Sequence, residues 1–176
     1  MKIAIAGGTG MVGKKLTELL LKNNHEVIIL TRSEPRTENN IHYVQWLKTG
    51  AQPETQLEQL DAFINLAGVS LNEGRWTNEQ KEKIYNSRME STDEAIRILQ
   101  ALAHKPNVLI NASAVGIYPV SETAVYTESS SEQADDFLGS VVADWEQKAA
   151  QAEKLGIRTC FTRFGVILAK GEGALP

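Results

Sequence analysis

The chain has 176 residues, enough for one domain, and its 42% apolar and 23% charged residues are typical of a soluble globular protein. A net charge of -4 without a run of Lys or Arg argues against binding to nucleic acid. No basic leader precedes the first apolar run, and apolar stretches such as residues 27–30 are too short to span a membrane. The single cysteine, Cys160, excludes an internal disulfide. These features predict a cytoplasmic protein without a membrane segment.

The start of the chain has the pattern of a strand–helix–strand unit. Residues 2–6 (KIAIA) form an apolar run that leads into glycines, and residues 11–23 carry apolar side chains at helical spacing. The pair Asn23-Asn24 ends this helix, and residues 26–31 (EVIILT) resemble a strand buried on both faces of a parallel sheet. The unit is therefore complete by residue 31.

Further elements are predicted downstream. Thr77, with Gln80 three residues later, forms a capping box at the start of a long helix, and Asp135 or Asp136 caps another helix, which Gly156 ends. In chain order we expect a polar, turn-rich stretch to Asn40, a strand at 43–46, a strand at 61–66, a helix at 77–104, a strand at 108–112, a long loop at 119–136, a helix at 137–155 and a strand at 157–163.

Strands that alternate with helices predict an α/β fold of the Rossmann type, with a doubly wound, mostly parallel sheet and helices on both faces. Residues 1–176 then form a single dinucleotide-binding domain. The alternation stops after Leu168, where the glycine-rich tail AKGEGALP remains. We therefore expect this chain to be the N-terminal part of a longer protein, with a C-terminal substrate domain absent.

A glycine loop joins the first strand to the first helix. Gly7, Gly10 and Gly13 have GxxGxxG spacing, in which the first glycine permits the turn off the strand, the second lets the backbone approach a pyrophosphate, and the third allows close helix packing. The pyrophosphate would lie at the helix N-terminus. The predicted dinucleotide contacts in this loop are Gly7, Thr9, Gly10, Met11, Val12 and Gly13. The alternative is a glycine-rich turn without a ligand.

The end of the second strand bears on the choice of cofactor. NAD sites usually present a carboxylate here to the ribose 2′-hydroxyl, whereas this sequence has Thr31, Arg32 and Ser33, with Arg36 nearby. A guanidinium suits a 2′-phosphate, and the hydroxyl groups can add hydrogen bonds. NADP(H) is the predicted cofactor. The alternative is a solvated arginine, which describes Arg36 better than Arg32.

Several short motifs in fixed order carry a family resemblance. They are AGGTGMVG, LTR, NLAG at residues 65–68, RW at 75–76, SR at 87–88, SAVGIY at 113–118, DWE at 144–146 and RFGVIL at 163–168. On these motifs the chain resembles the extended short-chain dehydrogenase/reductases, and within them the epimerase-like proteins of the NAD-dependent epimerase/dehydratase superfamily, some of which are labelled cell division inhibitor. The resemblance covers essentially the whole chain.

The resemblance implies further cofactor contacts and a missing domain. Leu66, Ala67 and Gly68 would line the adenine and ribose side of the dinucleotide, Arg88 would lie on the cofactor side, and Ile167 would contact the nicotinamide half. The alternatives are a strand end with a tight turn for NLAG, a core role for Ile167, and a surface arginine paired with Glu90 or Asp93 for Arg88. The family also implies a further strand and a substrate-binding domain.

The catalytic residues are harder to identify. Short-chain dehydrogenases use a Tyr-x-x-x-Lys pair, yet none of the four tyrosines has a lysine four residues later. Ser113 and Tyr118 are the candidates, with a hydroxyl bonded to nearby backbone and a packing tyrosine as the respective alternatives. Glu146 is the nearest acid in the helix that can replace the missing base, although the sequence favours a solvated glutamate paired with nearby lysines. The three scattered histidines predict no metal site.

Two functions follow from these expectations. The first is an NADP(H)-dependent oxidoreductase or epimerase-like enzyme that transfers hydride on a small hydroxylated, sugar-like substrate. The second is a protein that binds NADP(H) as a sensor and performs no chemistry, which the missing Tyr and Lys favour. Whether the protein is an enzyme, and its oligomeric state, are left open by the sequence.

Overall fold

The computed structural model describes residues 1–71, 75–169 and 172–173. Its elements, with η for 3₁₀ helices, are β1 (Lys2–Ala6), α1 (Met11–Lys22), β2 (Glu26–Thr31), β3 (Arg36–Glu38), β4 (Ile41–Gln45), η1 (Pro53–Gln56), β5 (Ala62–Asn65), α2 (Asn78–Ala101), β6 (Val108–Ala114), η2 (Val115–Ile117), α3 (Phe137–Ala149), η3 (Ala150–Leu155), β7 (Arg158–Phe164), β8 (Leu168–Ala169) and β9 (Glu172–Gly173).

One seven-stranded sheet forms the centre of the fold. Its strand order is β3-β4-β2-β1-β5-β6-β7, and every neighbouring pair in it is parallel except β3 with β4. β1 pairs with β2 over its full length, from Lys2 against Glu26 to Ala6 against Leu30. The order reverses at β1, which is the switch point of a doubly wound sheet. The Rossmann-type prediction is therefore confirmed.

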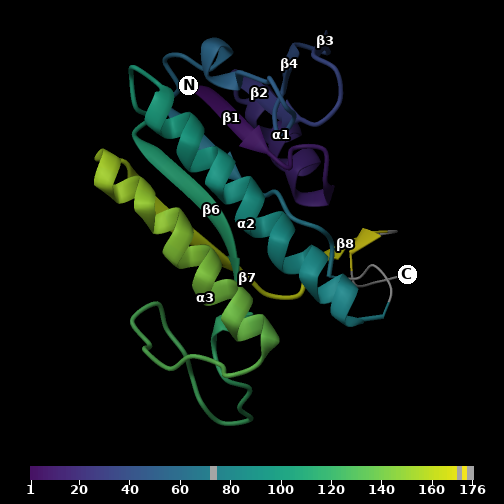
Figure 1. Cartoon of the computed structure of the whole chain (residues 1–176), viewed down its shortest axis with the longest axis vertical. Coiled ribbons are helices and arrows are strands. Elements are labelled where there is room, and N and C mark those ends of the chain that lie inside the picture. The colour runs from purple at the N-terminus through teal and green to yellow at the C-terminus, as the bar shows by residue number, and fades with distance from the viewer. Residues whose placement is uncertain (72–74, 170–171, 174–176) are drawn as a thin grey trace.

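Helices cover both faces of this sheet. α2 and α3 lie side by side over one face, as Figure 1 shows, and pack on apolar side chains such as Phe63 and Leu109. α1 packs on the opposite face through Leu16 and Leu20, against Ile3 and neighbouring β-branched residues. Strands buried on both faces in this way explain the nearly continuous apolar runs in the sequence. In the described ranges, no helix is both long enough and apolar enough to cross a membrane.

An antiparallel edge strand occupies part of the stretch predicted to be polar turns. β3 and β4 form a hairpin whose two loop residues, Asn39 and Asn40, have φ values of 52° and 61°. Two successive residues with positive φ make the type I′ turn of tight hairpins, which asparagine tolerates. The guanidinium of Arg36 lies 3.7 Å from the ring centroid of Tyr43 on the facing strand. The expectation of turn structure throughout this stretch is wrong, because a three-residue strand is too short to show a pattern.

Helix caps lie where the sequence places them. The Thr77 side chain accepts the main-chain N–H of Gln80 at 3.2 Å, and Asp136 accepts that of Gly139 at 2.8 Å. Asp136, rather than Asp135, is thus the cap of α3. The predicted helix at 137–155 divides into α3 and η3, and Gly156 ends it with a φ of 77°.

The other boundaries shift by a few residues. α2 ends at Ala101 instead of residue 104, β4 begins at Ile41, and β6 and β7 extend to Ala114 and Phe164. No helix or strand interrupts the loop at 119–136, as expected. β8 and β9 pair antiparallel within a stretch expected to lack elements. The rest of that predicted tail, residues 170–171 and 174–176, lies outside the described residues.

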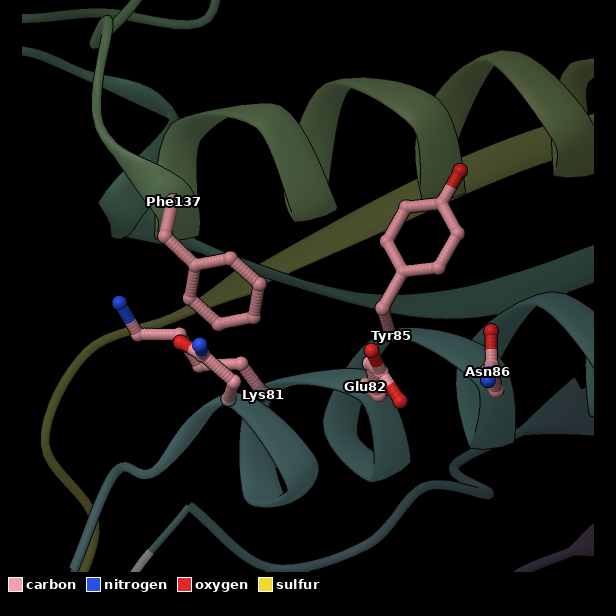
Figure 2. Close-up of a pocket in the computed structure, with 6 residues that line it drawn as sticks. Lys81, Glu82, Tyr85, Asn86 and Phe137 are labelled. Atoms are coloured by element: carbon pink, nitrogen blue, oxygen red, sulfur yellow. The ribbon is translucent and has the colours of Figure 1, made fainter.

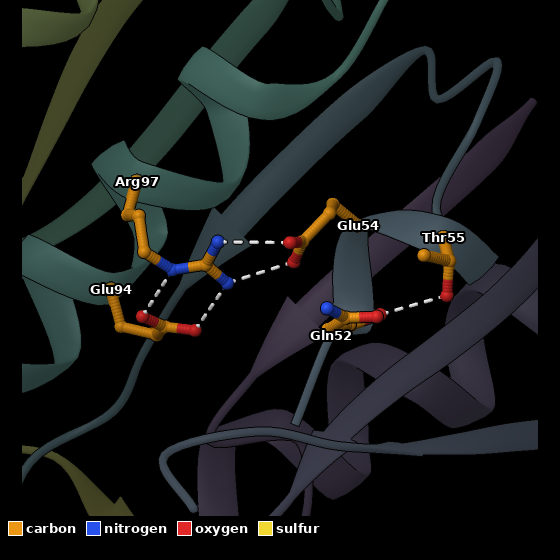
Figure 3. Close-up of polar contacts among 5 residues, drawn as sticks. All are labelled: Gln52, Glu54, Thr55, Glu94 and Arg97. Carbon is orange, nitrogen blue, oxygen red and sulfur yellow. Dashed lines mark hydrogen bonds and ion pairs between the residues drawn. The ribbon is translucent and has the colours of Figure 1, made fainter. Parts of the chain in front are cut away.

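A salt-bridge cluster attaches η1 to α2. Arg97 donates to both oxygens of Glu54, at 3.0 and 2.8 Å, and to both oxygens of Glu94, at 2.8 and 2.7 Å (Figure 3). The hydrogen bond from Arg97 lowers the pKa of Glu54. The guanidinium is exposed, so water screens the cluster and its contribution to stability is small. It fixes the position of the short connection between β4 and β5.

Candidate functional site

Main-chain atoms leave no room for a side chain at Gly7, in the loop between β1 and α1, or at Gly13, in the first turns of α1. Gly7 has a φ of 77°, and a Cβ there would lie 2.6 Å from the carbonyl carbon and oxygen of Leu66. A Cβ at Gly13 would lie 2.4 Å from the oxygen of Gly7 and 2.5 Å from the Cα of Gly8. At Gly10 the nearest atom would be 3.4 Å away. Gly13 therefore lets α1 approach the loop itself, whereas a Cβ at Gly10 would make only an ordinary contact.

The first turn of α1 keeps its main-chain donors free of side-chain caps. Gly10 is the N-cap residue without a side-chain hydrogen bond, and no acidic residue lies in this turn. Thr9 is exposed, and Met11 and Val12 are half-buried. Uncapped N–H groups and the positive end of the helix dipole suit a bound anion. The residues predicted for the pyrophosphate, between Gly7 and Gly13, thus lie together in one site, which we call the glycine cradle.

The end of β2 presents an unpaired arginine. The Thr31 hydroxyl accepts the main-chain N–H two residues later at 3.1 Å, which turns the chain and leaves Arg32 exposed. Within the described ranges no carboxylate pairs with Arg32, since the nearby Glu34 lies 3.7 Å from Lys48. Arg36 instead points along the hairpin, over the ring described above. The two arginines therefore differ in the opposite way to the expected one: Arg36 has partners within the hairpin, whereas Arg32 is exposed and has none in the described ranges.

A buried polar network fixes the end of β5. Asn65 accepts the main-chain N–H of Ala67 at 3.2 Å and donates to Thr92 at 3.2 Å and to Asn111 at 2.8 Å. Trp145 donates its indole N–H to the same Thr92 oxygen at 3.0 Å. Asn65, Thr92 and Asn111 are fully buried. The network joins β5, β6, α2 and α3, so the stretch that follows β5 is held rigidly beside the glycine loop.

Arg88 faces this stretch from α2. A Cβ at Gly68 would lie 3.2 Å from the guanidinium carbon of Arg88, which lies 5.2 Å from the Trp145 ring centroid. Its Nη1 donates to two main-chain carbonyl oxygens at 2.9 and 3.2 Å, and burial lowers its pKa. The alternative of a surface arginine paired with Glu90 or Asp93 is wrong, because no carboxylate of the described ranges pairs with it. Arg88 therefore lies against the stretch that follows β5.

A four-residue polar cluster lies at the carboxyl ends of β6 and β7. Glu146 of α3 accepts from Arg163, with Nε to Oε1 and Nη2 to Oε2 both 2.8 Å. Ser113 donates its hydroxyl to Glu146, and Arg163 Nη1 donates to the phenol oxygen of Tyr118. The cluster therefore runs as one chain from Ser113 through Glu146 and Arg163 to Tyr118.

The burial of this cluster corrects two expectations. Glu146 is 9% exposed and pairs with an arginine, so the alternative of a solvated glutamate beside lysines is wrong. Burial raises the pKa of Glu146, but the hydrogen bonds from Arg163 and Ser113 outweigh it and hold this pKa below its ordinary value. Ser113 is 3% exposed and bonds to this carboxylate, not to nearby backbone. Sequence reasoning gave Arg163 no role.

Tyr118 is half-buried and also anchors the long loop. Its phenol donates to the main-chain oxygen of Thr127 at 2.8 Å, and its ring stacks on Tyr126 with centroids 4.9 Å apart. The packing role therefore exists together with the contact to Arg163. Ile167 is half-buried and lies three residues beyond the carboxyl end of β7. Nearly all of the expected site residues thus lie at or near the carboxyl ends of the strands.

A shallow hollow of about 310 Å³ lies elsewhere, between the starts of α2 and α3. Figure 2 shows the Phe137 ring directed toward Lys81 and the Tyr85 ring reaching toward α3. Tyr85 donates to Asp144 at 2.9 Å, which raises the pKa of this phenol. None of the residues that line the hollow belongs to the glycine loop, the end of β2 or the Arg163 cluster. It is therefore separate from the cradle.

Comparison with known proteins assigns the family. Residues 3–174 match the model of the NAD dependent epimerase/dehydratase family. The chain belongs to this family. It is 46% identical over 177 residues to the epimerase family protein YfhF of Bacillus subtilis, covering all of this chain and 58% of YfhF. The epimerase family therefore matches the resemblance drawn from the motifs, and the chain spans a little over half of the relative's length.

Two solved structures of family members have the same fold. The human epimerase family protein SDR39U1, solved with NADPH, is 29% identical with a TM-score of 0.82, and the match covers 99% of this chain and 57% of the human one. A nucleoside-diphosphate sugar epimerase from Corynebacterium glutamicum is 33% identical with a TM-score of 0.80, covering 100% and 36%. The Rossmann-type assignment agrees with both.

Proposed function

We propose that residues 1–176 form the NADP(H)-binding domain of an epimerase-like oxidoreductase that transfers hydride on a small hydroxylated, sugar-like substrate. The observation that carries the proposal is the glycine cradle. Main-chain atoms fill the positions of a Cβ at Gly7 and Gly13, while a Cβ at Gly10, beside the uncapped helix donors, would make only an ordinary contact. A pyrophosphate fits such a cradle because it needs close main-chain N–H groups and no carboxylate.

The sheet order gives the dinucleotide a direction. With the pyrophosphate at β1, the adenosine half extends over β2 toward Arg32, and the nicotinamide half extends the other way, over β5, β6 and β7. When bound, the cofactor supplies or accepts a hydride at its nicotinamide ring. The residues proposed to line it are Gly7, Thr9, Gly10, Met11, Val12, Gly13, Thr31, Arg32, Leu66, Ala67, Gly68, Arg88 and Ile167.

A preference for NADP(H) over NAD(H) follows from the guanidinium of Arg32, which is exposed and unpaired among the residues that the structure describes. A 2′-phosphate gives it a doubly charged partner, whereas a 2′-hydroxyl does not. The human relative solved with NADPH supports this choice. A substrate related to nucleotide sugars is supported by the name of the Corynebacterium relative, a nucleoside-diphosphate sugar epimerase. The half-buried Cys160, the only cysteine, is compatible with a cytoplasmic protein.

A sensor that binds NADP(H) without chemistry is the second candidate. The specific observation in its favour is the absence of a Tyr-x-x-x-Lys pair from α3, where short-chain dehydrogenases carry it. Oxidation of NADPH in the presence of a panel of nucleotide-linked keto sugars separates the two candidates. Turnover of any panel member refutes the pure sensor.

The decisive test of the cofactor assignment compares Arg32→Asp with Arg36→Asp. Both remove one cation from the same stretch, but only Arg32 is free to meet a 2′-phosphate. Titration of NADPH and NADH, followed by cofactor fluorescence, should show that R32D loses NADPH affinity by about tenfold or more and keeps NADH affinity. R36D should bind NADPH like the wild type. Equal affinities of the wild type for both cofactors would overturn the preference.

A further inference from the structure

We propose that Tyr118 is the proton-transfer residue of this site, held at its phenol oxygen by Arg163, and that Glu146 and Ser113 are positioning residues. The assignment rests on the proposed hydride transfer and names the group that replaces the missing Tyr-x-x-x-Lys pair. It also separates the two candidate hydroxyl groups, Ser113 and Tyr118, which the sequence could not rank.

Ser113 is unsuited to proton transfer because its hydroxyl is buried and donates to a charged carboxylate. A hydroxyl has one hydrogen to donate, and Ser113 donates it to the carboxylate of Glu146 at a position that is 3% exposed. Glu146 is held as the anion and both of its oxygens are occupied by Arg163. Tyr118 is half-buried, so its phenol is the acidic group of the cluster that a ligand can reach.

Arg163 has the geometry to stabilise a phenolate. Its Nε and Nη2 form a bidentate pair with Glu146, which fixes the plane of the guanidinium. The remaining nitrogen, Nη1, donates to the phenol oxygen of Tyr118. A guanidinium keeps its charge at any working pH, so the phenol oxygen always faces a positive charge. Arg163 thus performs, from β7, the task that the lysine of the usual pair performs from a helix.

The cluster also lies on the correct side of the cradle. Tyr118 follows β6, which is the second strand from β1 in the sheet, roughly 10 Å away at the usual strand spacing. The nicotinamide half of a dinucleotide anchored at β1 extends in this direction, away from Arg32. Arg163 at the end of the next strand closes the far side of the phenol.

The proton balance is simple. During reduction, hydride adds to the carbonyl carbon of the substrate, the electron pair of the C=O bond moves to oxygen, and that oxygen takes the proton of the Tyr118 phenol. The phenolate faces Arg163 until water returns a proton, and oxidation runs the same steps in reverse. The phenol proton is donated to the Thr127 oxygen in the structure. For the reaction, the phenol O–H rotates away from the Thr127 carbonyl and donates to the substrate oxygen instead.

Nitration by tetranitromethane tests the assignment without a known substrate, because the reagent attacks tyrosine phenolates. The full chain is treated at mildly alkaline pH, and nitration of each tyrosine is followed by mass spectrometry with fragment sequencing. The comparison variant is R163M/E146Q, since R163M alone would leave Glu146 a buried, unpaired charge. Tyr118 should react about tenfold more slowly in this variant, the ratio expected for a lost charge-assisted hydrogen bond. Tyr126, which stacks on Tyr118, is the internal reference.

The second measurement is protection by NADP⁺, and it needs only the wild-type protein. Saturating NADP⁺ should slow nitration of Tyr118 severalfold and leave Tyr85, which lies between α2 and α3 and donates to Asp144, unchanged. An equal fall at Tyr118 and Tyr126 in the double variant would show that Arg163 only packs the loop, and would overturn the assignment. NADP⁺ binding in calorimetry without protection of Tyr118 would also overturn it. No binding at all would overturn the proposed function itself.

Discussion

Gly13→Ala should damage both the fold and the cradle. The added methyl group would lie 2.4 Å from the Gly7 oxygen and 2.5 Å from the Gly8 Cα, and both contacts are with main chain that cannot rotate away. Overpacking of this severity costs about 3 kcal/mol, and the better helix propensity of alanine returns about 1 kcal/mol. The net loss of about 2 kcal/mol lowers the Tm by roughly 4–8 °C in a chain of this size.

Gly10→Ala is the matched control, because its Cβ would have the Gly7 oxygen as its nearest neighbour at an ordinary 3.4 Å. Circular dichroism during heating should give G10A a Tm within about 3 °C of the wild type, since an alanine N-cap costs at most about 1 kcal/mol. NADPH titration should nonetheless show weaker binding by both variants, because the new methyl group of G10A faces the pyrophosphate. An unchanged Tm for G13A would refute the close approach of α1, and full NADPH affinity of G10A would refute the placement of the pyrophosphate.

Three further variants test other parts of the structure. Glu146 has a pKa below its ordinary 4.5, so the stability that its charged form adds is present above pH 4.5 and is lost as the pH falls through the lowered pKa. Urea unfolding should therefore show that the wild type is more stable than E146Q at neutral pH and that this difference in unfolding free energy shrinks in acid. Thr92→Val removes the acceptor shared by Asn65 and Trp145, and urea unfolding should show a loss of about 1–3 kcal/mol, whereas an unchanged midpoint would contradict the network. Arg97→Met should cost about 1 kcal/mol or less at low salt and still less in molar NaCl; a larger loss would mean that the exposed cluster is not screened by water.

Local sequence signals predicted the cradle and most of the fold. The glycine spacing, the parallel-type strands and the caps at Thr77 and Asp136 each act within a few residues, so a reader of the sequence can assign them. β3 escaped this reading because three residues carry no periodicity. The Asn39-Asn40 pair was the available signal, since two adjacent asparagines suit the positive φ values of a hairpin turn.

The polar cluster depends on contacts between distant segments, which the sequence does not display. Ser113 and Glu146 are 33 residues apart, and Tyr118 and Arg163 are 45 apart. The parallel pairing of β6 with β7, in which Ser113 lies opposite Arg163, and the packing of α3 against β6 bring them together. A useful signal was nevertheless present in the sequence: Glu146 lies on the helix α3 and Arg163 near the end of the following strand, β7. Both residues lie near the carboxyl ends of the strands.

The two edges of the sheet differ in what they offer another polypeptide. β3 is three residues long, and all three residues are exposed. Its first and last residues, Arg36 and Glu38, form an ion pair, so this edge strand is short and charged. Short charged edges discourage strand addition, which is how many β-proteins avoid self-association. β7, at the other edge of the sheet, is seven residues long. Any polypeptide that extends this sheet by strand addition is therefore expected to join at β7, beside Arg163, and not at the adenosine side.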